Sequence, residues 1–195
     1  RRSSDLRSTI SKFGLGVHVV GINVTISKGT IFSHCLDSVR VEQVGTEIVR
    51  GIRIRDSRFH GTPTGLIGHC IDIVGTQQAE IEVTGNVADG VGSFFRGHLS
   101  RRSRISNNSV AGGTGNGFEF IGGTSGRADD NTVGGCLGNA MMLKNCASPS
   151  IDGLTVDSVQ KNGIVLDNCT NWLLRSLNIL NVNMLYATDG HVYDG

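Results

Sequence analysis

The amino-acid sequence predicts an all-β protein, a right-handed parallel β-helix of about seven coils. Three observations support this prediction. A period of 23 residues relates successive segments of the chain, from Gly85-Asn86-Val87 onward. Apolar and polar residues alternate over short runs, as they do in strands. Glycine is abundant at 28 of 195 residues, whereas there are only 2 prolines, and this mixture suits a chain with many tight turns.

The period is clearest in a set of anchor residues that recur every 23 positions: Val87, Val110, Val133, Val156 and Ile179. A fixed period of this size is typical of stacked units, because each unit is too small to bury its apolar face alone. We therefore expect the anchors to form one interior column. Each of the first four is followed, eight residues later, by another large apolar residue, and three of these have an asparagine two residues before them: Phe95, Phe118, Met141 and Ile164, with Asn116, Asn139 and Asn162.

The spacing of apolar residues within a unit distinguishes strand from helix. Phe118 and Phe120 are separated by one residue, as are Met141 and Leu143, whereas a helical repeat would need about ten residues with a 3.6-residue spacing. Glycine, asparagine, serine and aspartate separate these runs and favour turns. Each unit is expected to contain two or three short strands that pair in parallel with the neighbouring coils.

The part of the chain before the regular repeat is less periodic. Residues 1–21 are expected to form an N-terminal connector or tail that ends in a first strand, Leu15–Val20. Residues 22–195 are expected to form the β-helix, as part of a longer chain. Its final coil ends without a polar capping unit, so we expect a partner to cover it.

The repeat can be traced backward from Val87 if two coils each gain five residues. Phe59 and Ile31 then become the earlier anchors, and the extra residues are expected near Gln43–Val49 and Gly75–Ala79. Loops of this kind tend to lie on the working face of a solenoid. Five residues before the anchors, a second apolar column is expected, which Glu82 interrupts: Ile26, Ile54, Ile105, Ala128, Ile151 and Leu174.

Composition argues against several classes of function. The formal net charge is +1 with mixed signs, which gives no electrostatic case for binding nucleic acid. No apolar run approaches the roughly 18 residues of a membrane-spanning helix, so membrane insertion is not expected. The sequence contains no phosphate-binding loop, and its histidines and cysteines lack metal-ligand spacing. We therefore expect neither a cofactor nor a metal ion.

The five cysteines include two at the same position of adjacent coils, Cys146 and Cys169. If these coils stack, the two residues lie about 4.8 Å apart, which would permit a disulfide. The simpler interpretation is a ladder of small buried side chains, because free cysteine is often buried. Unpaired thiols suggest assembly in a reducing compartment.

Two segments carry a resemblance to a known family. Asn116-Gly117-Phe118-Glu119-Phe120 and Asn162-Gly163-Ile164-Val165-Leu166-Asp167-Asn168-Cys169 resemble the rungs of the pectate-lyase-like right-handed β-helix superfamily. This superfamily includes polysaccharide lyases, glycoside hydrolases, uronate epimerases and bacteriophage tailspikes, so the resemblance implies a polysaccharide as the partner. It covers about Ile22 to Asp189. The motifs of particular subfamilies are missing or occur in the wrong order, as with Asp129-Asp130 after Gly97-His98-Leu99.

Strand alternation predicts which side chains face outward. With Phe118 and Phe120 inside, one outer face would collect polar residues from neighbouring coils: Arg96, His98, Glu119, Lys144 and Asp167. Glycoside hydrolysis commonly uses two carboxyl groups, so Glu119 and Asp167 are candidate catalytic residues if their side chains lean together. Arg96, His98 and Lys144 would then bind substrate. The alternative is a solvated face on which Lys144 and Asp167 form an ordinary ion pair.

A second outward column holds Asp129, Asp152 and Arg175. Two carboxylates about 5 Å apart fit a retaining pair, with the arginine as a substrate ligand. The alternative role of such aspartates is to bond the backbone at turns. Trp172 is a candidate sugar-stacking platform or a cap over the core. Asn108 and Asn131 are assigned to structure, as stacked amides.

These observations leave two classes of function. The first is a bacteriophage tailspike or tail-associated protein, located in the virion tail, that binds a bacterial surface polysaccharide. The sequence leaves open whether it also depolymerises this polysaccharide. Such proteins are typically trimers, so a homotrimer or larger virion assembly is the expected state. The alternatives are a secreted polysaccharide lyase or hydrolase, which would act extracellularly, and a structural or adhesive solenoid without catalysis.

Overall fold

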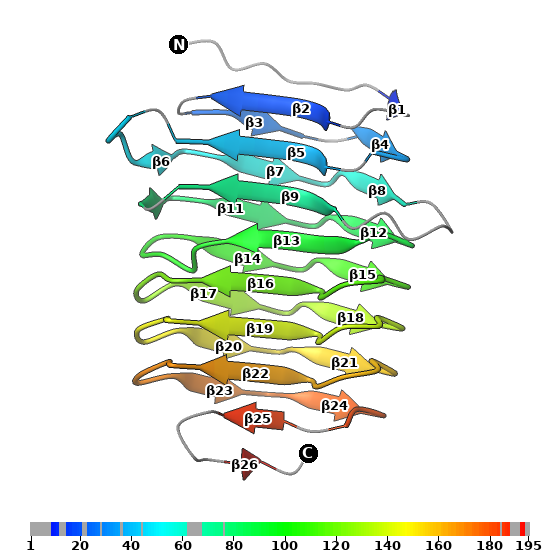
Figure 1. Cartoon of the computed structure of the whole chain (residues 1–195), viewed down its shortest axis with the longest axis vertical. Coiled ribbons are helices and arrows are strands. Elements are labelled where there is room, and N and C mark those ends of the chain that lie inside the picture. Colours follow the sequence, from blue (N-terminus) through cyan, green and yellow to red (C-terminus); the bar gives the residue numbers. More distant parts are fainter. Residues whose placement is uncertain are drawn as a thin grey trace.

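Three parallel sheets run side by side along the axis of a right-handed coil of about seven turns (Figure 1). This computed structural model describes residues 9–11, 15–20, 23–27, 29–35, 37–43, 45–61, 68–75, 77–183, 185–187 and 192–193. Every regular element among these residues is a strand. None of them forms a helix, and so none offers a helix that could cross a bilayer. The predicted fold class is confirmed.

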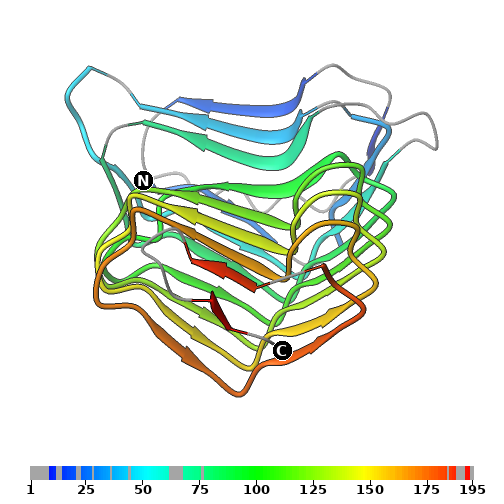
Figure 2. The same cartoon turned by 60° about the horizontal axis from the view of Figure 1, so that its bottom comes forward.

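Each coil contributes one strand to each sheet, and the sheets meet at the corners of a three-sided cross-section (Figure 2). Sheet A contains β1 (Thr9–Ser11), β4 (Ile31–Ser33), β8 (Arg58–His60), β12 (Val87–Asp89), β15 (Ser109–Ala111), β18 (Thr132–Gly134), β21 (Thr155–Asp157) and β24 (Asn178–Leu180). Sheet B contains β2 (Leu15–Val20), β5 (Asp37–Glu42), β9 (His69–Val74), β13 (Ser93–Gly97), β16 (Phe118–Ile121), β19 (Met141–Lys144), β22 (Ile164–Asp167), β25 (Leu185–Ala187) and β26 (Val192–Tyr193).

Sheet C contains β3 (Thr25–Ile26), β7 (Arg53–Arg55), β11 (Glu82–Thr84), β14 (Arg104–Ser106), β17 (Arg127–Asp129), β20 (Ser150–Asp152) and β23 (Leu173–Arg175). A separate two-stranded sheet joins β6 (Val49–Arg50) to β10 (Gln78–Ala79). All of these pairings are parallel except β25 with β26. The strand expected at Leu15–Val20 is β2, and β1 and β2 extend the sheets into the range expected to be a connector.

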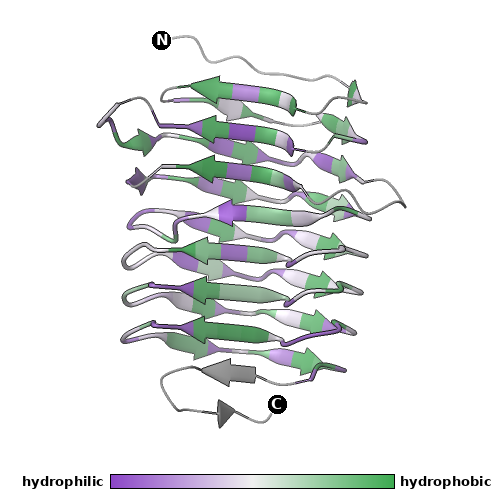
Figure 3. Cartoon of the chain, in the orientation of Figure 1, coloured by the Kyte–Doolittle hydropathy of each residue, from purple (hydrophilic) through white to green (hydrophobic). Residues whose placement is uncertain are grey.

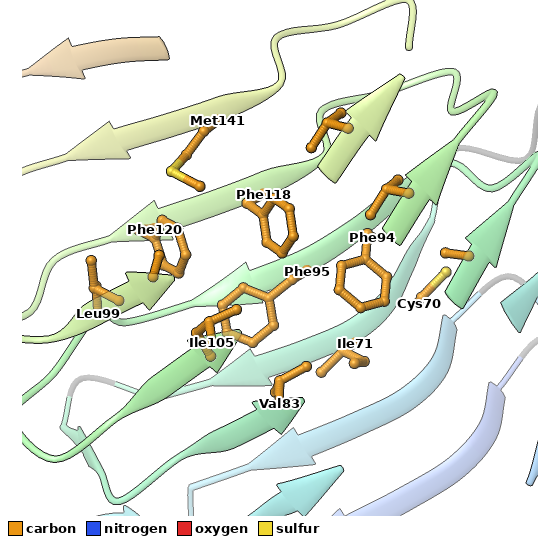
Figure 4. Packing of buried hydrophobic residues seen from close by; sticks show 14 of the residues in the cluster. Cys70, Ile71, Val83, Phe94, Phe95, Leu99, Ile105, Phe118, Phe120 and Met141 are labelled. Carbon is orange, nitrogen blue, oxygen red and sulfur yellow. The ribbon is translucent and has the colours of Figure 1, made fainter. Parts of the chain in front are cut away.

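The interior is filled by columns of side chains, each column taking one residue from every coil. Aromatic rings form its centre: Phe32 stacks on Phe59 with ring centroids 5.0 Å apart, and Phe94 meets Phe59 and Phe118 edge-on. Figure 4 shows Phe94, Phe95, Phe118 and Phe120 packed between the sheets. These rings are completely buried, so each coil completes the core of the next, as the repeat predicted.

The predicted anchor column is correct from Val110 onward and wrong at Val87. Val110, Val133, Val156 and Ile179 pair in register, but Val110 pairs with Ala88, and the side chain of Val87 is 45% exposed. The cause is a turn between β12 and β13 that is one residue shorter than its successors. Ala88 precedes Phe95 by seven residues, whereas Val110 precedes Phe118 by eight.

The same shift explains two further corrections. Val83, not Glu82, occupies the second column between Ile54 and Ile105, so Glu82 does not interrupt it and faces outward. In sheet A, Phe32 rather than Ile31 pairs with Phe59, because the two coils around Phe59 gain unequal numbers of residues. In both places the residue that is buried in the column lies one position after the residue that the fixed period predicts.

The enlarged coils lie only partly where the sequence indicated. The first insertion falls in the segment between β5 and β6, inside the predicted range Gln43–Val49. The second is divided. Ile71 to Val83 spans 12 residues against 10 for Phe95 to Ile105, so only two extra residues lie near Gly75–Ala79. The larger share precedes β9, in a stretch that contains residues 62–67, which lie outside the described part of the chain.

Two asparagine ladders fasten the turns. At the turn from sheet C to sheet A, Asn86 donates its backbone N–H to Asn108 Oδ1, 3.1 Å away, and Asn108 donates to Asn131 Oδ1 at the same distance. Their side-chain amides also donate to carbonyls of sheet C in the preceding coil, those of Ile54, Val83 and Ile105. At the start of sheet B, Asn116, Asn139 and Asn162 form the second ladder. The structural role predicted for Asn108 and Asn131 is confirmed.

Candidate functional site

A row of charged side chains runs across the outer face of sheet B, one from each of four neighbouring strands. The register pairs Arg40 of β5 with Asp72 of β9, Asp72 with Arg96 of β13, and Arg96 with Glu119 of β16. Because each side chain stands one strand from the next, the signs alternate along the coil axis at about 4.8 Å per step. Figure 3 shows the polar bands that these residues make on otherwise apolar strands.

The centre of the row is a two-pronged ion pair. Arg96 donates from Nε and Nη2 to the two carboxylate oxygens of Asp72, at 2.8 and 2.7 Å. On the other side, Arg40 Nη1 lies 4.0 Å from Asp72 Oδ2, and its Nε donates to Glu42 at 2.7 Å. Asp72 is only 1% exposed. An ionised carboxylate buried this deeply requires such pairing, so Asp72 holds both guanidinium groups in place.

Glu119 ends the row and is held by two neighbours. Asn116 Nδ2 donates to its Oε1 at 2.8 Å, and His69 Nε2 lies 3.5 Å from its Oε2. Burial opposes ionisation of Glu119, but the neighbouring His69 ring, the hydrogen bond from Asn116 and the charge of Arg96 outweigh it, so the pKa of this carboxyl is lowered. The side chains of His69 and Glu119 remain 17% and 15% exposed, but the Nε2 atom of His69 is itself buried and has no hydrogen-bond partner.

His69 stands where the second asparagine ladder breaks. Asp37 Oδ1 accepts the backbone N–H of His69 at 3.0 Å, and Ser93 Oγ accepts that of Asn116 at 3.1 Å. No such bond joins Ser93 to the side chain of His69, because the backbone N–H of Ser93 donates to the carbonyl of Gly68 instead. The imidazole ring of His69 therefore takes no part in the ladder, and it is directed to Glu119 instead.

The structure brings together part of the first predicted face. Arg96 and Glu119 are in-register neighbours, and Lys144 Nζ lies 3.5 Å from Asp167 Oδ2, as the ion-pair alternative required. Glu119 and Asp167 are two strands apart and in different columns, roughly 12 Å between Cα atoms, with Met142 and Lys144 between their strands. They do not converge. Their catalytic roles stay a prediction, and the arrangement favours Glu119 alone.

Two other predicted ligands lie away from the row. His98 follows β13; its backbone N–H donates to Gln78 Oε1 at 2.8 Å, and burial lowers the pKa of its ring. Trp172 is half-buried and packs against the C-terminal end of the core, which fits the cap rather than the platform. Their predicted contact with a substrate stays untested.

The second predicted constellation forms the expected column. Asp129 pairs in register with Asp152, and Asp152 with Arg175. However, Asp129 is nearly buried, and its Oδ2 lies 3.3 Å from Nε of Arg127 on the same strand. An acid that is buried and already paired is a poor proton donor to a bulky polymer. This column carries less weight than the row on sheet B.

Sequence reasoning missed the residues that hold the row together: Asp37, Arg40, His69 and Asp72. A signal for two of them was present. Val39 and Val41 alternate with Arg40, and Ile71 and Ile73 alternate with Asp72, so both charged residues face outward from otherwise apolar strands. The enlarged coils broke the 23-residue period there and hid the alignment with Arg96.

The row contains one group suited to accept a proton. Glu119 is an ionised carboxylate, and the ring of His69 lies beside it. Both arginines are already paired with Asp72, and therefore they fix the position of this carboxylate before they contact any ligand. Within the described residues, no three histidine, cysteine, aspartate or glutamate side chains converge as ligands.

Comparison with known proteins agrees with this architecture. No curated protein and no solved structure matches the chain. One family model does match, described as the right handed beta helix region, and it covers residues 49–192. The match spans most of the coils described above, including β9, β13 and β16 of the charged row. The chain thus belongs to the right-handed β-helix family, whose fold supports a polysaccharide-binding or polysaccharide-processing protein in general.

Proposed function

We propose that this protein is a bacteriophage tailspike or tail-associated β-helix that binds a bacterial surface polysaccharide along sheet B and cleaves it at Glu119. The observation that carries the proposal is the preorganised row on β5, β9, β13 and β16, in which the ionised, partly exposed carboxylate of Glu119 stands beside the ring of His69. Such a pair of titratable groups, with one pKa shifted by its neighbours, is a recurring feature of catalytic sites.

The short distance between His69 and Glu119 favours elimination over hydrolysis. An inverting hydrolase needs about 6.5–9.5 Å between its acid and base, to leave room for a water molecule. Here the two groups touch at 3.5 Å. In a β-elimination, Glu119 takes the proton from the carbon next to a uronate carboxylate, the glycosidic C–O bond breaks, and water gives a proton to the leaving oxygen. His69, whose Nε2 is buried beside Glu119, positions this carboxylate. The products are a new chain end and an unsaturated sugar.

The cysteines support assembly inside a reducing cell, where virion proteins are made. Cys35, Cys70, Cys136, Cys146 and Cys169 are all free thiols, and every one except Cys35 is buried. Proteins secreted through an oxidising compartment tend to use such residues in disulfides. This observation favours the virion over the secreted enzyme.

A homotrimer is part of the same proposal. The last strands of sheets C and A expose Leu173 and Leu180, at 41% and 54%, and Leu174, Leu177 and Ile179 are only partly buried. Apolar residues at the end of a coil favour association. Sedimentation of the 195-residue chain tests this: a trimer is expected, and a stable monomer would remove the support for a larger assembly.

The activity is tested with a panel of capsular, O-antigen and pectic polysaccharides. Absorbance from an unsaturated product reports a lyase, and new reducing ends without that absorbance report a hydrolase. Glu119→Gln should remove the activity, whereas Asp157→Asn, at an exposed carboxylate on β21 of sheet A, should keep it. A rate that survives in Glu119→Gln excludes Glu119 as the base, and failure to bind any polymer favours a structural solenoid.

A further inference from the structure

Sheet C carries a set of arginines on its outer face that the charged row does not use. Arg53 of β7, Glu82 of β11, Arg104 of β14 and Arg127 of β17 follow one another in register. The turn before β14 adds Arg101 and Arg102. We call Arg101, Arg104 and Arg127 the arginine strip; all three side chains are exposed.

Arg104 and Arg127 form an unfavourable pair in the protein alone. They lie directly opposite each other on adjacent parallel strands, about 4.8 Å apart at Cα. Like charges at such positions destabilise a sheet. Arg127 Nε lies 3.3 Å from Asp129 Oδ2. This contact uses one nitrogen of the guanidinium group and leaves the outer edge of the group available to a ligand.

No acid relieves Arg104. Its other in-register neighbour is Glu82, but this carboxylate already binds Arg55 Nη2 and lies 3.7 Å from Arg53 Nε. Within the described part of the chain, the side chains of Arg104 and Arg101 have no hydrogen-bonded or ion-paired partner. Two stacked guanidinium groups with free donors form a receptor for anionic groups such as carboxylate, sulfate or phosphate.

The net charge of the region has the same sign as the strip. Strands β7, β11, β14 and β17, with the turns that lead into β11 and β14, carry six arginines and three carboxylates: Arg53, Arg55, Arg101, Arg102, Arg104 and Arg127, against Glu80, Glu82 and Asp129. The outer face of sheet B carries five carboxylates and three cations: Asp37, Glu42, Asp72, Glu119 and Asp167, against Arg40, Arg96 and Lys144. The overall charge of +1 hides this asymmetry.

We infer that the arginine strip on sheet C is a binding site for an anionic polysaccharide, separate from the row on sheet B. The polymer is identified by charge complementarity with the strip, and its being a polysaccharide rests on the proposed function. Successive strands place guanidinium groups along the coil axis, so a polymer that lies along the axis meets both Arg104 and Arg127. A second contact of this kind raises the effective concentration of polymer near sheet B.

The test compares two double variants that each remove two positive charges. Arg104→Gln/Arg127→Gln alters the strip, and Arg58→Gln/Lys161→Gln alters exposed cations elsewhere on the coil. Binding is measured by titration with polygalacturonate, dextran sulfate, neutral dextran and single-stranded DNA. At low salt the strip variant should bind the two anionic polysaccharides at least about tenfold more weakly than wild type. For this variant, the slope of log affinity against log salt concentration should be less negative by about one for each arginine lost.

The outcomes separate this inference from the proposed function. Equal losses in the two double variants, no binding to either anionic polysaccharide, or tighter binding to DNA than to both of them would each overturn the strip. If the strip variant binds the anionic polysaccharides more weakly than wild type, and wild type cleaves no polymer, the strip stands and the proposed catalysis fails. If wild type cleaves a polymer, and the strip variant binds that polymer as tightly as wild type does, the strip fails and the proposed catalysis stands.

Discussion

The coils before Ala88 and those after Val110 are built differently, although the same three sheets run through both. After Val110 the strands of sheet A follow one another every 23 residues. Before Ala88 the corresponding steps are 27 and 29, and the step from Val39 to Ile71 in sheet B is 32. Two charged residues are buried in the described part of the chain: Asp72, 1% exposed, in the irregular coils, and Asp129, 7% exposed, in the regular ones.

This difference shows what the repeat is for. The regular coils present an outer column of Met142 and Val165 and one exposed ion pair on sheet B, which has little chemistry to offer. The irregular coils use inserted residues and a broken ladder to place Asp72 and His69 beside Arg96 and Glu119 of the two following coils. A strict period therefore marks the part of the chain that serves as scaffold, and departures from it mark where side chains are free to do other work.

The largest effect is expected where the two regions share one column. Val133→Asp should leave no soluble folded protein, because a carboxylate at this fully buried position has no partner, and the cost exceeds about 4 kcal/mol. Val87→Asp, at the exposed position that the fixed period equates with Val133, should melt within a few degrees of wild type. Thermal melts check both, and equal damage from the two substitutions would contradict the register described here.

Removing the centre of the charged row should have the next largest effect. Asp72→Ala leaves Arg40 and Arg96 without their shared buried carboxylate, and loss of one partner of a buried pair typically costs about 3–5 kcal/mol. Denaturant unfolding measures the change. Asp157→Ala removes an exposed carboxylate from a regular coil and serves as the control. Similar denaturation midpoints for the two variants would mean that the ion pairs of Asp72 with Arg40 and Arg96 do not stabilise the fold.

The asparagine ladder should contribute less than the row. Asn108→Ala leaves the backbone N–H of Asn86 buried without a partner, at a cost of about 1–3 kcal/mol, and removes the side-chain bond to the carbonyl of Val83. The melting temperature should fall by roughly 5–10 °C, since about 2–4 °C corresponds to 1 kcal/mol in a chain of this size. Asn183→Ala, which removes an exposed amide bond to Gln160, should have almost no effect. An unchanged melting point for Asn108→Ala argues against the ladder.

A smaller effect with a distinct pH dependence is expected at Glu119. Its pKa is lowered in the folded protein, so its carboxylate stabilises the fold above the ordinary glutamate value of 4.5, and this contribution is lost as pH falls through the folded pKa. Glu119→Gln should therefore be less stable than wild type at pH 7, by about 1 kcal/mol for one charge-assisted hydrogen bond. The gap should close below pH 4.5. A gap that is constant from pH 7 to pH 3 would show that the charge of Glu119 is not involved.

The smallest effect is expected on the outer face of the regular coils. Lys144 and Asp167 are 51% and 40% exposed, and surface pairs of this kind contribute about 0–1 kcal/mol. Lys144→Ala should shift the melting temperature by no more than about 2 °C, and added salt should reduce the difference further. A larger shift would mean that the scaffold coils also depend on their outer charges.

Most of the fold was predictable from sequence because burial repeats with the coil. The anchors from Val110 to Ile179, the alternation around Phe118 and the neighbours Arg96 and Glu119 all follow from a fixed period and a two-residue strand repeat. The prediction failed at Val87 because a turn lost one residue, while a valine happened to stand one position before the buried alanine. Apolar identity alone does not reveal a one-residue slip.

The candidate site was less predictable for two physical reasons. Asp72 and His69 lie after an insertion of unknown length, so no fixed period could align them with Arg96 and Glu119. The arginine strip depends on which sheet each residue joins, and the sequence gives only a mixed charge near zero. Both features require the register of neighbouring strands, which local spacing does not contain.

The two ladders have a mechanical consequence. In the ladder of Asn86, Asn108 and Asn131 the acceptor belongs to the later coil, whereas in the ladder of Asn116, Asn139 and Asn162 it belongs to the earlier one. With the step from Ser93 to Asn116, they overlap from the coil of Asn86 to the coil of Asn139, where coils are tied at two corners. Under tension along the axis the chain should therefore unravel from both ends, and the middle coils with Phe118 should be the last to yield.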